Sequence, residues 1–433
     1  MRLELNSIRI EDIAFGEKTS ISGRTLSINR AELQALLRED RRLKDADIEL
    51  AHPGDKSRIV KVVDVIEPRA KTSDGDQDFP GAVGKQAAAG KGNTCVLKGT
   101  AVVLSDYREK WDTTHSADPN GEIIEMCGPG AEVSIIGKTH NVVVLATPND
   151  GVSANDYLSA VKIAGLKTAA YLARTGKGET PDETEVFELA SMADTKEMCG
   201  SLPRIVYIYQ IQTLQFEPVQ GEPILYGKNV PDLVPTLIHP NEVLDGAITS
   251  PLPTLNMLTY HVQNHPIIRE LYKRHGKELC FGGVILTLAP NNVADMERVA
   301  NMAANLAKYI VGADGVILTK MGGGAPELAM AKTAQRCEQL GMKTAIAMLH
   351  MGADMRDTKY GGMTIFSLPE VDAIVSMGVP FVDLNLPAVD RIIGRPNFSS
   401  AGPHIDGEIV RSINRIKGSL CQLGSSKLRA MRY

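Results

Sequence analysis

Long apolar runs are absent from the sequence, and this absence excludes a membrane-spanning helix. No segment reaches the ~18 apolar residues that a helix needs to cross a bilayer. The first residues, MRLELNSIRIED, lack the apolar core of a secretory signal, so we expect a cytoplasmic protein. With 43% hydrophobic and 23% charged residues, the composition also excludes a disordered chain.

Blocks of one charge and paired cysteines are absent as well. The net charge of -5 is spread along the chain, which indicates no partnership with nucleic acid and none with a membrane. No CxxC pair occurs, so the sequence predicts no metal site and no disulfide framework. We expect six reduced thiols, at Cys95, Cys127, Cys199, Cys280, Cys337 and Cys421.

Residues 1–150 contain short β-like runs such as IVKVVDVIEP and CVLKGTAVVLSDY, separated by Gly, Pro and Asp. They predict a mostly β domain. Residues 151–200 are predicted to hold a helix, from Asn155 to about Gly176, and a polar linker, KGETPDETE.

Residues 201–433 are predicted to form an α/β domain with a mainly parallel sheet. RIVYIYQIQ is typical of a buried strand, and from Leu279 strand-like and helix-like segments alternate. The runs DAIVSMG and PAVDRIIG are expected to continue this sheet. The whole chain is therefore assigned to the α/β class.

Two loops after these strands contain groups that could bind a ligand. The triplet Gly322–Gly324 could present backbone N–H groups to an anion, or be a plain turn before a helix. His350, near Asp354 and Arg356, could act in acid-base chemistry, bind a metal, or simply hydrogen-bond within its loop. The single tryptophan, Trp111, could cover a cationic ligand or anchor a surface.

Several long segments together resemble one family. They are MRLELNSIRIEDIAFGEKTSISGRTL, DIELAHPGDKSRIVKVVDVIEPR, CGPGAEVSIIGKTHNVVVL, HPNEVLDGAI and NHPIIRELYKRHGKEL. In order and spacing they are similar to the component B proprotein of glycine, sarcosine and betaine reductases. The resemblance extends from residue 1 to at least Gly394.

The resemblance implies a substrate-recognition subunit of an oxidoreductase complex of anaerobic amino-acid fermentation. Its implied partners are a selenocysteine-containing component B subunit, the small selenoprotein A, component C and a thioredoxin-type dithiol reductant. Together such complexes convert a small amine substrate, phosphate and the dithiol reductant into acetyl phosphate, the released amine and the oxidised disulfide.

The glycine-specific members are cut at an Asn-Cys bond shortly after DGAI, and the cysteine becomes a pyruvoyl group. That carbonyl condenses with a substrate amine that carries hydrogen. Here DGAI is Asp245–Ile248, and no cysteine occurs between Cys199 and Cys280. We therefore expect an uncut chain without a cofactor of its own; the fallback is a pyruvoyl group made from Ser250.

Loss of the cysteine suits glycine betaine, whose quaternary ammonium cannot form an imine and can leave as trimethylamine. A selenolate of a partner could attack the methylene carbon directly. The leading hypothesis is thus a betaine reductase subunit. Two alternatives stay open: a sarcosine or glycine reductase subunit with a pyruvoyl group from Ser250, and a non-catalytic homologue that only binds the partner.

Such a substrate needs aromatic rings and carboxylates around its cation, and donors for its carboxylate. As catalytic residues we expect Glu242, Asp245 and His261. As substrate-binding residues we expect Tyr226, Tyr260, His265, His350 and Trp111. Structural roles compete with these: Tyr260 could be a core residue, Glu242 and Asp245 turn or cap residues, and His265 the start of a helix.

Overall fold

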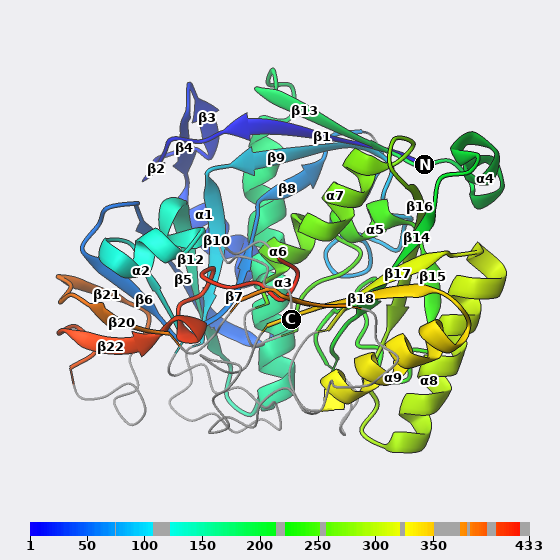
Figure 1. The fold of residues 1–433 in the computed structure, drawn as a ribbon. Coiled ribbons are helices and arrows are strands. Elements are labelled where there is room, and N and C mark those ends of the chain that lie inside the picture. Colours follow the sequence, from blue (N-terminus) through cyan, green and yellow to red (C-terminus); the bar gives the residue numbers. More distant parts are fainter. Residues whose placement is uncertain are drawn as a thin grey trace.

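The computed structural model describes residues 1–73, 75–106, 122–213, 221–251, 257–320, 325–349, 373–378, 382–395 and 404–424. Trp111, His350 and Gly322–Gly324 lie outside these residues. Within them, no helix is long and apolar enough to cross a membrane. Helices and several sheets are combined, so the predicted α/β class is confirmed. Figure 1 shows the β-rich part on one side and a helix-covered sheet on the other.

Two four-stranded sheets form most of the β-rich part. The first has the order β13-β1-β9-β8, with bounds Glu183–Glu188, Arg2–Arg9, Gly92–Lys98 and Arg69–Lys71. The second has the order β5-β12-β10-β7, with bounds Leu43–Ala51, His140–Pro148, Thr100–Ser105 and Val62–Ile66. Strand β13 includes part of the segment that we expected to be a linker. It pairs with β1 as an edge strand, and most of its side chains stay exposed, which explains its polar sequence.

Helix α3 (Ala154–Ala173) lies against these strands and continues as a short 3₁₀ turn to Gly176. The predicted helix at Asn155 to Gly176 is confirmed. Fourteen of its twenty residues are buried, among them Lys162. Because the helix is apolar on most sides, it forms a central layer of the β-rich part and not a surface helix.

A six-stranded sheet forms the other part, in the order β15-β16-β14-β17-β18-β19. The bounds are Thr236–Ile238, Cys280–Thr287, Arg204–Gln210, Gly315–Thr319, Lys343–Met348 and Ile374–Ser376. All neighbours are parallel except β15 and β16, which confirms the predicted mainly parallel sheet.

Both faces of this sheet are covered. Val206 and Ile208 of β14 pack on the side of α8 (Val293–Asn305) and α9 (Ala325–Gln339). Tyr207 and Tyr209 point to the opposite face, into a core that includes Val243, Val262 and Ile268 from three further helices. A central strand buried on both faces has no alternation of apolar and polar residues, as RIVYIYQ illustrates.

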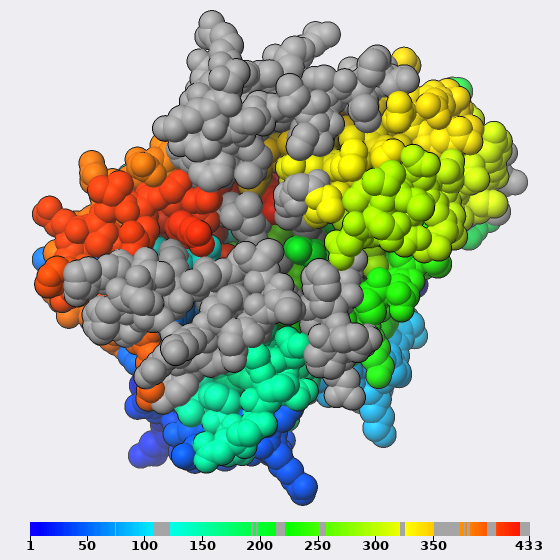
Figure 2. Space-filling model, turned by 90° about the horizontal axis from the view of Figure 1, so that it is seen from below, coloured from blue at the N-terminus to red at the C-terminus, as the bar shows by residue number. Residues whose placement is uncertain are grey.

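The C-terminal segment returns to the β-rich part. Strand β21 (Arg391–Ile393) pairs with β6 (Ser57–Val60), next to β11 (Ile123–Glu125). The prediction that PAVDRIIG continues the parallel sheet is therefore wrong, because a short apolar run does not specify which sheet edge it joins. Figure 2 shows this orange and red segment beside the blue N-terminal half.

The remaining elements are short. Two of them are small sheets, β2-β4-β3 (Asp12–Phe15, Thr25–Ile28, Ser20–Ser22) and β20-β22 (Asp383–Leu386, Ile409–Ser412). Short helices include α1 (Arg30–Leu37), α2 (Gly128–Val133), α4 (Met192–Cys199) and the π-helix η4 (Leu306–Val311), which continues α8.

Cys199, at the end of α4, and Cys280, at the start of β16, form a disulfide. The expectation of six reduced thiols is thus wrong for this pair, since a spacing of 81 residues carries no recognisable signal.

Candidate functional site

Three short helices and their connections hold most of the predicted site residues. They are α5 (Pro240–Leu244), α6 (Thr259–Gln263) and α7 (Pro266–Arg274). His239 begins α5 through a capping box with Glu242, in which the His239 N–H donates to the Glu242 carboxylate at 2.7 Å. The segment between α5 and α6, which we call the junction (residues 245–258), is described except for residues 252–256.

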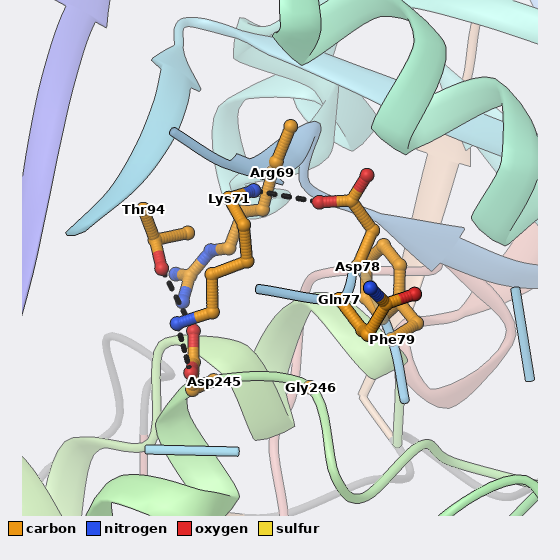
Figure 3. Close-up of a pocket in the computed structure, with 9 residues that line it drawn as sticks. Arg69, Lys71, Gln77, Asp78, Phe79, Thr94, Asp245 and Gly246 are labelled. Carbon is orange, nitrogen blue, oxygen red and sulfur yellow. Dashed lines mark hydrogen bonds and ion pairs between the residues drawn. The ribbon is translucent and has the colours of Figure 1, made fainter. Parts of the chain in front are cut away.

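Asp245 opens the junction, and groups from the β-rich part surround its carboxylate. Lys71 pairs with it through Nζ. The Gly90 N–H donates to Oδ2 at 2.7 Å, and Thr94 Oγ1 donates to Oδ1 at 2.8 Å. Figure 3 shows Lys71 and Thr94 converging on this carboxylate. Asp245 is buried, and its donors tie the junction to strands β8 and β9.

A small cavity lies beside this cluster, between Asp245, Arg69 and Phe79. Its volume of about 10 Å³ is room for about one water molecule. An amine substrate does not fit there, so Asp245 positions the junction without offering a substrate pocket at this spot.

A second buried cluster holds the junction at Ser250. Lys162 of α3 forms an ion pair with Asp64 of β7 and also donates to the Ser250 carbonyl. Asp64 accepts from the Thr259 N–H at 2.8 Å and from Thr259 Oγ1 at 2.6 Å. The Ser250 N–H in turn donates to Thr259 Oγ1 at 3.1 Å. A carboxylate at the first turn of α6 also suits the positive end of that helix.

A third cluster fixes the end of α6. The side-chain amide of Gln263 exchanges two hydrogen bonds with the backbone of Glu67, at 2.9 and 3.1 Å. Burial alone would raise the pKa of Glu67, but the charges of Lys98 and Arg69 outweigh it and lower this pKa to about 2. Burial is the main cause of the raised pKa of Tyr260, and the negative charge of Glu67 raises it further. Tyr260 packs partly buried against the core of the β-rich part.

Tyr226 and Glu242 are brought together, as a cation-binding pair would require. The Tyr226 hydroxyl donates to Glu242 Oε2 at 2.5 Å. Burial and this hydrogen bond raise the pKa of Tyr226, so the phenol stays protonated. Tyr226 has a φ of 47°, in the left-handed region that side chains seldom occupy, and this conformation places its ring beside α5.

His265 has a structural position at the start of α7. Its Nδ1 accepts from the Ile268 N–H at 3.4 Å, and its Nε2 lies 3.1 Å from the Tyr207 hydroxyl. The ring contacts Tyr207 and Tyr209 edge-on, with centroids 5.0 and 5.2 Å away. Burial lowers the pKa of His265 to about 3. The imidazole is therefore neutral, and a neutral ring is a poor partner for a substrate carboxylate.

His261 of α6 differs from all of these. Its side chain is 1% exposed, yet neither ring nitrogen has a hydrogen-bond partner among the described residues. Buried polar groups are nearly always hydrogen-bonded, and an unpaired one costs about 1–3 kcal/mol. Of the predicted site residues within the described part of the chain, His261 is the one whose side chain has buried polar atoms without a hydrogen-bond partner.

The sequence interpretation missed the charged residues that hold the junction. Lys162 stands in the apolar helix segment YLSAVKIAGL, and Asp64 stands in the apolar run VVDVI. A charge inside a segment predicted to be buried was the available signal. Such a residue must find a partner, because an unpaired buried charge is very costly.

The comparisons place the chain among known proteins. A family model described as glycine/sarcosine/betaine reductase component B subunits matches residues 1–430. The protein "Glycine reductase complex component B subunits alpha and beta" of Acetoanaerobium sticklandii is 35% identical to this chain. The match covers 100% of this chain and 100% of the relative.

Two relatives from Peptoclostridium acidaminophilum act in other complexes. The alpha subunit of sarcosine reductase component B is 34% identical, covering 92% of this chain and 90% of the relative. The alpha subunit of betaine reductase component B is 33% identical, and the match covers 91% of this chain and 88% of the relative. No solved structure matches the chain.

Proposed function

Because the chain belongs to the family of glycine, sarcosine and betaine reductase component B subunits, we propose that it binds the amine substrate of such a complex and that this substrate is glycine betaine. The family gives the chain a reductase role within a complex of several proteins. The identities of 33–35% to glycine, sarcosine and betaine relatives are too similar to favour one substrate. The choice of betaine must therefore rest on the residues of this chain.

The observation that carries the proposal is the absence of any cysteine between Cys199 and Cys280. Without a precursor cysteine at the junction, the chain lacks the group expected to form an imine with a primary or secondary amine. A quaternary amine needs no imine. Cleavage of its C–N bond requires a nucleophilic selenolate on a partner protein, which displaces trimethylamine. A dithiol reductant supplies two electrons, and phosphate accepts the acetyl group.

The environment of Ser250 supports an uncut junction. Ser250 is fully buried, its N–H and carbonyl are both hydrogen-bonded, and its neighbour Pro251 is also buried. Conversion to a pyruvoyl group would separate Ser250 from Thr249, whose N–H and hydroxyl bond to the backbone of Ile224 and Pro223. These hydrogen bonds hold the residues on both sides of the Thr249–Ser250 peptide bond that would break.

Within this proposal, His261 hydrogen-bonds to the carboxylate of the substrate, because neither nitrogen of its buried ring has a partner among the described residues. Tyr226 and Glu242 supply an aromatic face and a carboxylate suited to a trimethylammonium group. We propose as partners a selenocysteine-containing component B subunit, selenoprotein A, component C and a thioredoxin-type reductant, and no cofactor within this chain.

Amine release tests the function. The full chain is combined with its selenoprotein partners, reductant and phosphate, and offered betaine, sarcosine or glycine in separate reactions. Trimethylamine from betaine is the expected product. Methylamine from sarcosine without trimethylamine from betaine would overturn the substrate, and no amine from any of them would favour a partner-binding homologue.

Intact mass gives an independent test of processing. The uncut chain has a mass of 46.7 kDa. Two fragments that meet at Ser250 would instead identify a pyruvoyl enzyme and a substrate whose nitrogen carries hydrogen.

A further inference from the structure

Asp12, His52 and His140 come together from three separate parts of the β-rich region. Asp12 begins β2, His52 follows β5, and His140 begins β12. The Nδ1 atoms of the two histidines are 3.3 Å apart, and Asp12 Oδ1 is 3.4 Å from His52 Nδ1. One donor atom from each residue lies within 4.8 Å of the other two. We propose that these residues form a binding site for a divalent transition-metal ion of the Zn²⁺ type.

The spacing of the donor atoms supports this site. Bonds of about 2.0–2.1 Å to a tetrahedral zinc ion place neighbouring ligand atoms about 3.3–3.4 Å apart. The separations of 3.3 and 3.4 Å fall in that range. Two imidazole nitrogens and one carboxylate oxygen are also a donor set that such ions prefer over Ca²⁺ or Mg²⁺. Asp12 Oδ1 also accepts from the Ile13 N–H at 2.9 Å, which fixes the carboxylate beside His52.

The surroundings suit an ion that enters from solvent. The side chains of His52 and Asp12 are 33% and 55% exposed, so the remaining coordination positions are open to water. The ring of His140 also hydrogen-bonds to the backbone of Glu11. Metal-binding histidines commonly make such a second contact, which fixes the orientation of the ring.

The ion would join residues of two separate sheets. Asp12 belongs to the small sheet β2-β4-β3, and the histidines flank the sheet β5-β12-β10-β7. Sequence motifs did not predict this site, because its three residues are 40 and 88 positions apart. The other cluster of this kind in the described residues, Cys199, His275 and Cys280, has its two sulfurs joined to each other.

Titration of Zn²⁺ into the metal-free full chain, followed by calorimetry, tests the site. One ion per chain is expected to bind. His52→Ala and His140→Ala should each weaken binding by about 100-fold, and Asp12→Asn by about tenfold. Two controls, His404→Ala at an exposed histidine and Cys280→Ser in the other cluster, should bind as the unmodified chain does.

Two results would overturn the proposal. One is the absence of stoichiometric binding to the unmodified chain, and the other is unchanged binding to the double variant His52→Ala/His140→Ala. Anomalous scattering from crystals of the unmodified chain grown with Zn²⁺ does not depend on the folding of any variant. It should place the ion between His52 and His140, and an ion at another position would count against the site.

Discussion

Lys162 and Asp64 form an ion pair whose side chains are only 0% and 1% exposed, directly beneath the junction. Removing one partner of a buried pair leaves an uncompensated charge, which usually costs about 3–5 kcal/mol. We therefore expect Lys162→Met to lower the free energy of unfolding by about that amount in a urea titration. The junction at Ser250 and Thr259 should loosen with it, because both bond to this pair.

The matched control is Arg38→Met. Arg38 pairs with Asp45, but both side chains are 50% exposed, so its loss should change stability by less than about 1 kcal/mol. The double variant Lys162→Met/Asp64→Leu should recover part of the loss, since two apolar groups leave no buried charge. Equal effects of Lys162→Met and Arg38→Met would contradict this role of the buried pair.

Lys162 and Asp64 also show which features of the fold could be predicted from the sequence. Apolar periodicity correctly predicted helix α3 and the alternating strands and helices, because burial on a helix face or in a central strand depends on local residues. Lys162 and Asp64 each stand out in an apolar run. Their pairing was not predictable, since 98 residues separate them and only the packing of α3 on β7 brings them together. The same reason hid the hydrogen bonds from Lys71 and Thr94 to Asp245.

The predicted site residues illustrate a second limit. Residue type and position selected Tyr226 and Glu242, which the fold brings together, although the Glu242 carboxylate also caps helix α5. The same criteria selected His265 and Asp245, which the fold uses to cap a helix and to anchor a loop. A side chain that can bind a ligand can equally bind the protein, and only its partners distinguish the two roles.

Replacing His261 separates a binding role from a structural one. Since neither ring nitrogen has a partner among the described residues, His261→Leu should leave the free energy of unfolding unchanged or higher. Amine release by the complete complex should fall by about 100-fold, a loss typical of removing a group that binds or transfers charge. His404→Leu, at an exposed histidine, should alter neither quantity. A stable His261→Leu variant with full activity would exclude His261 from the site.

The disulfide predicts the reactivity of the cysteines. In protein isolated without reductant and then denatured, an alkylating reagent should modify the four free cysteines Cys95, Cys127, Cys337 and Cys421. Prior reduction should raise the number of adducts to six. In Cys280→Ser, Cys199 should react without reduction, because its partner is gone. Six adducts on the unreduced chain would show that the two thiols are not joined.

The neutral state of His265 predicts a dependence of stability on pH. Burial lowers the pKa of this imidazole from 6.5 to about 3 in the folded chain, whereas in the unfolded chain it takes up a proton below about 6.5. Stability linked to His265 is thus complete above pH 6.5 and is lost as the pH falls towards 3. Between pH 7 and 5 this loss should be about 2 kcal/mol. His265→Asn keeps a helix-capping side chain but cannot be protonated, so its unfolding free energy should fall less over the same interval. Urea titrations of both proteins at pH 7 and 5 provide the comparison, and equal losses would show that His265 is not held neutral.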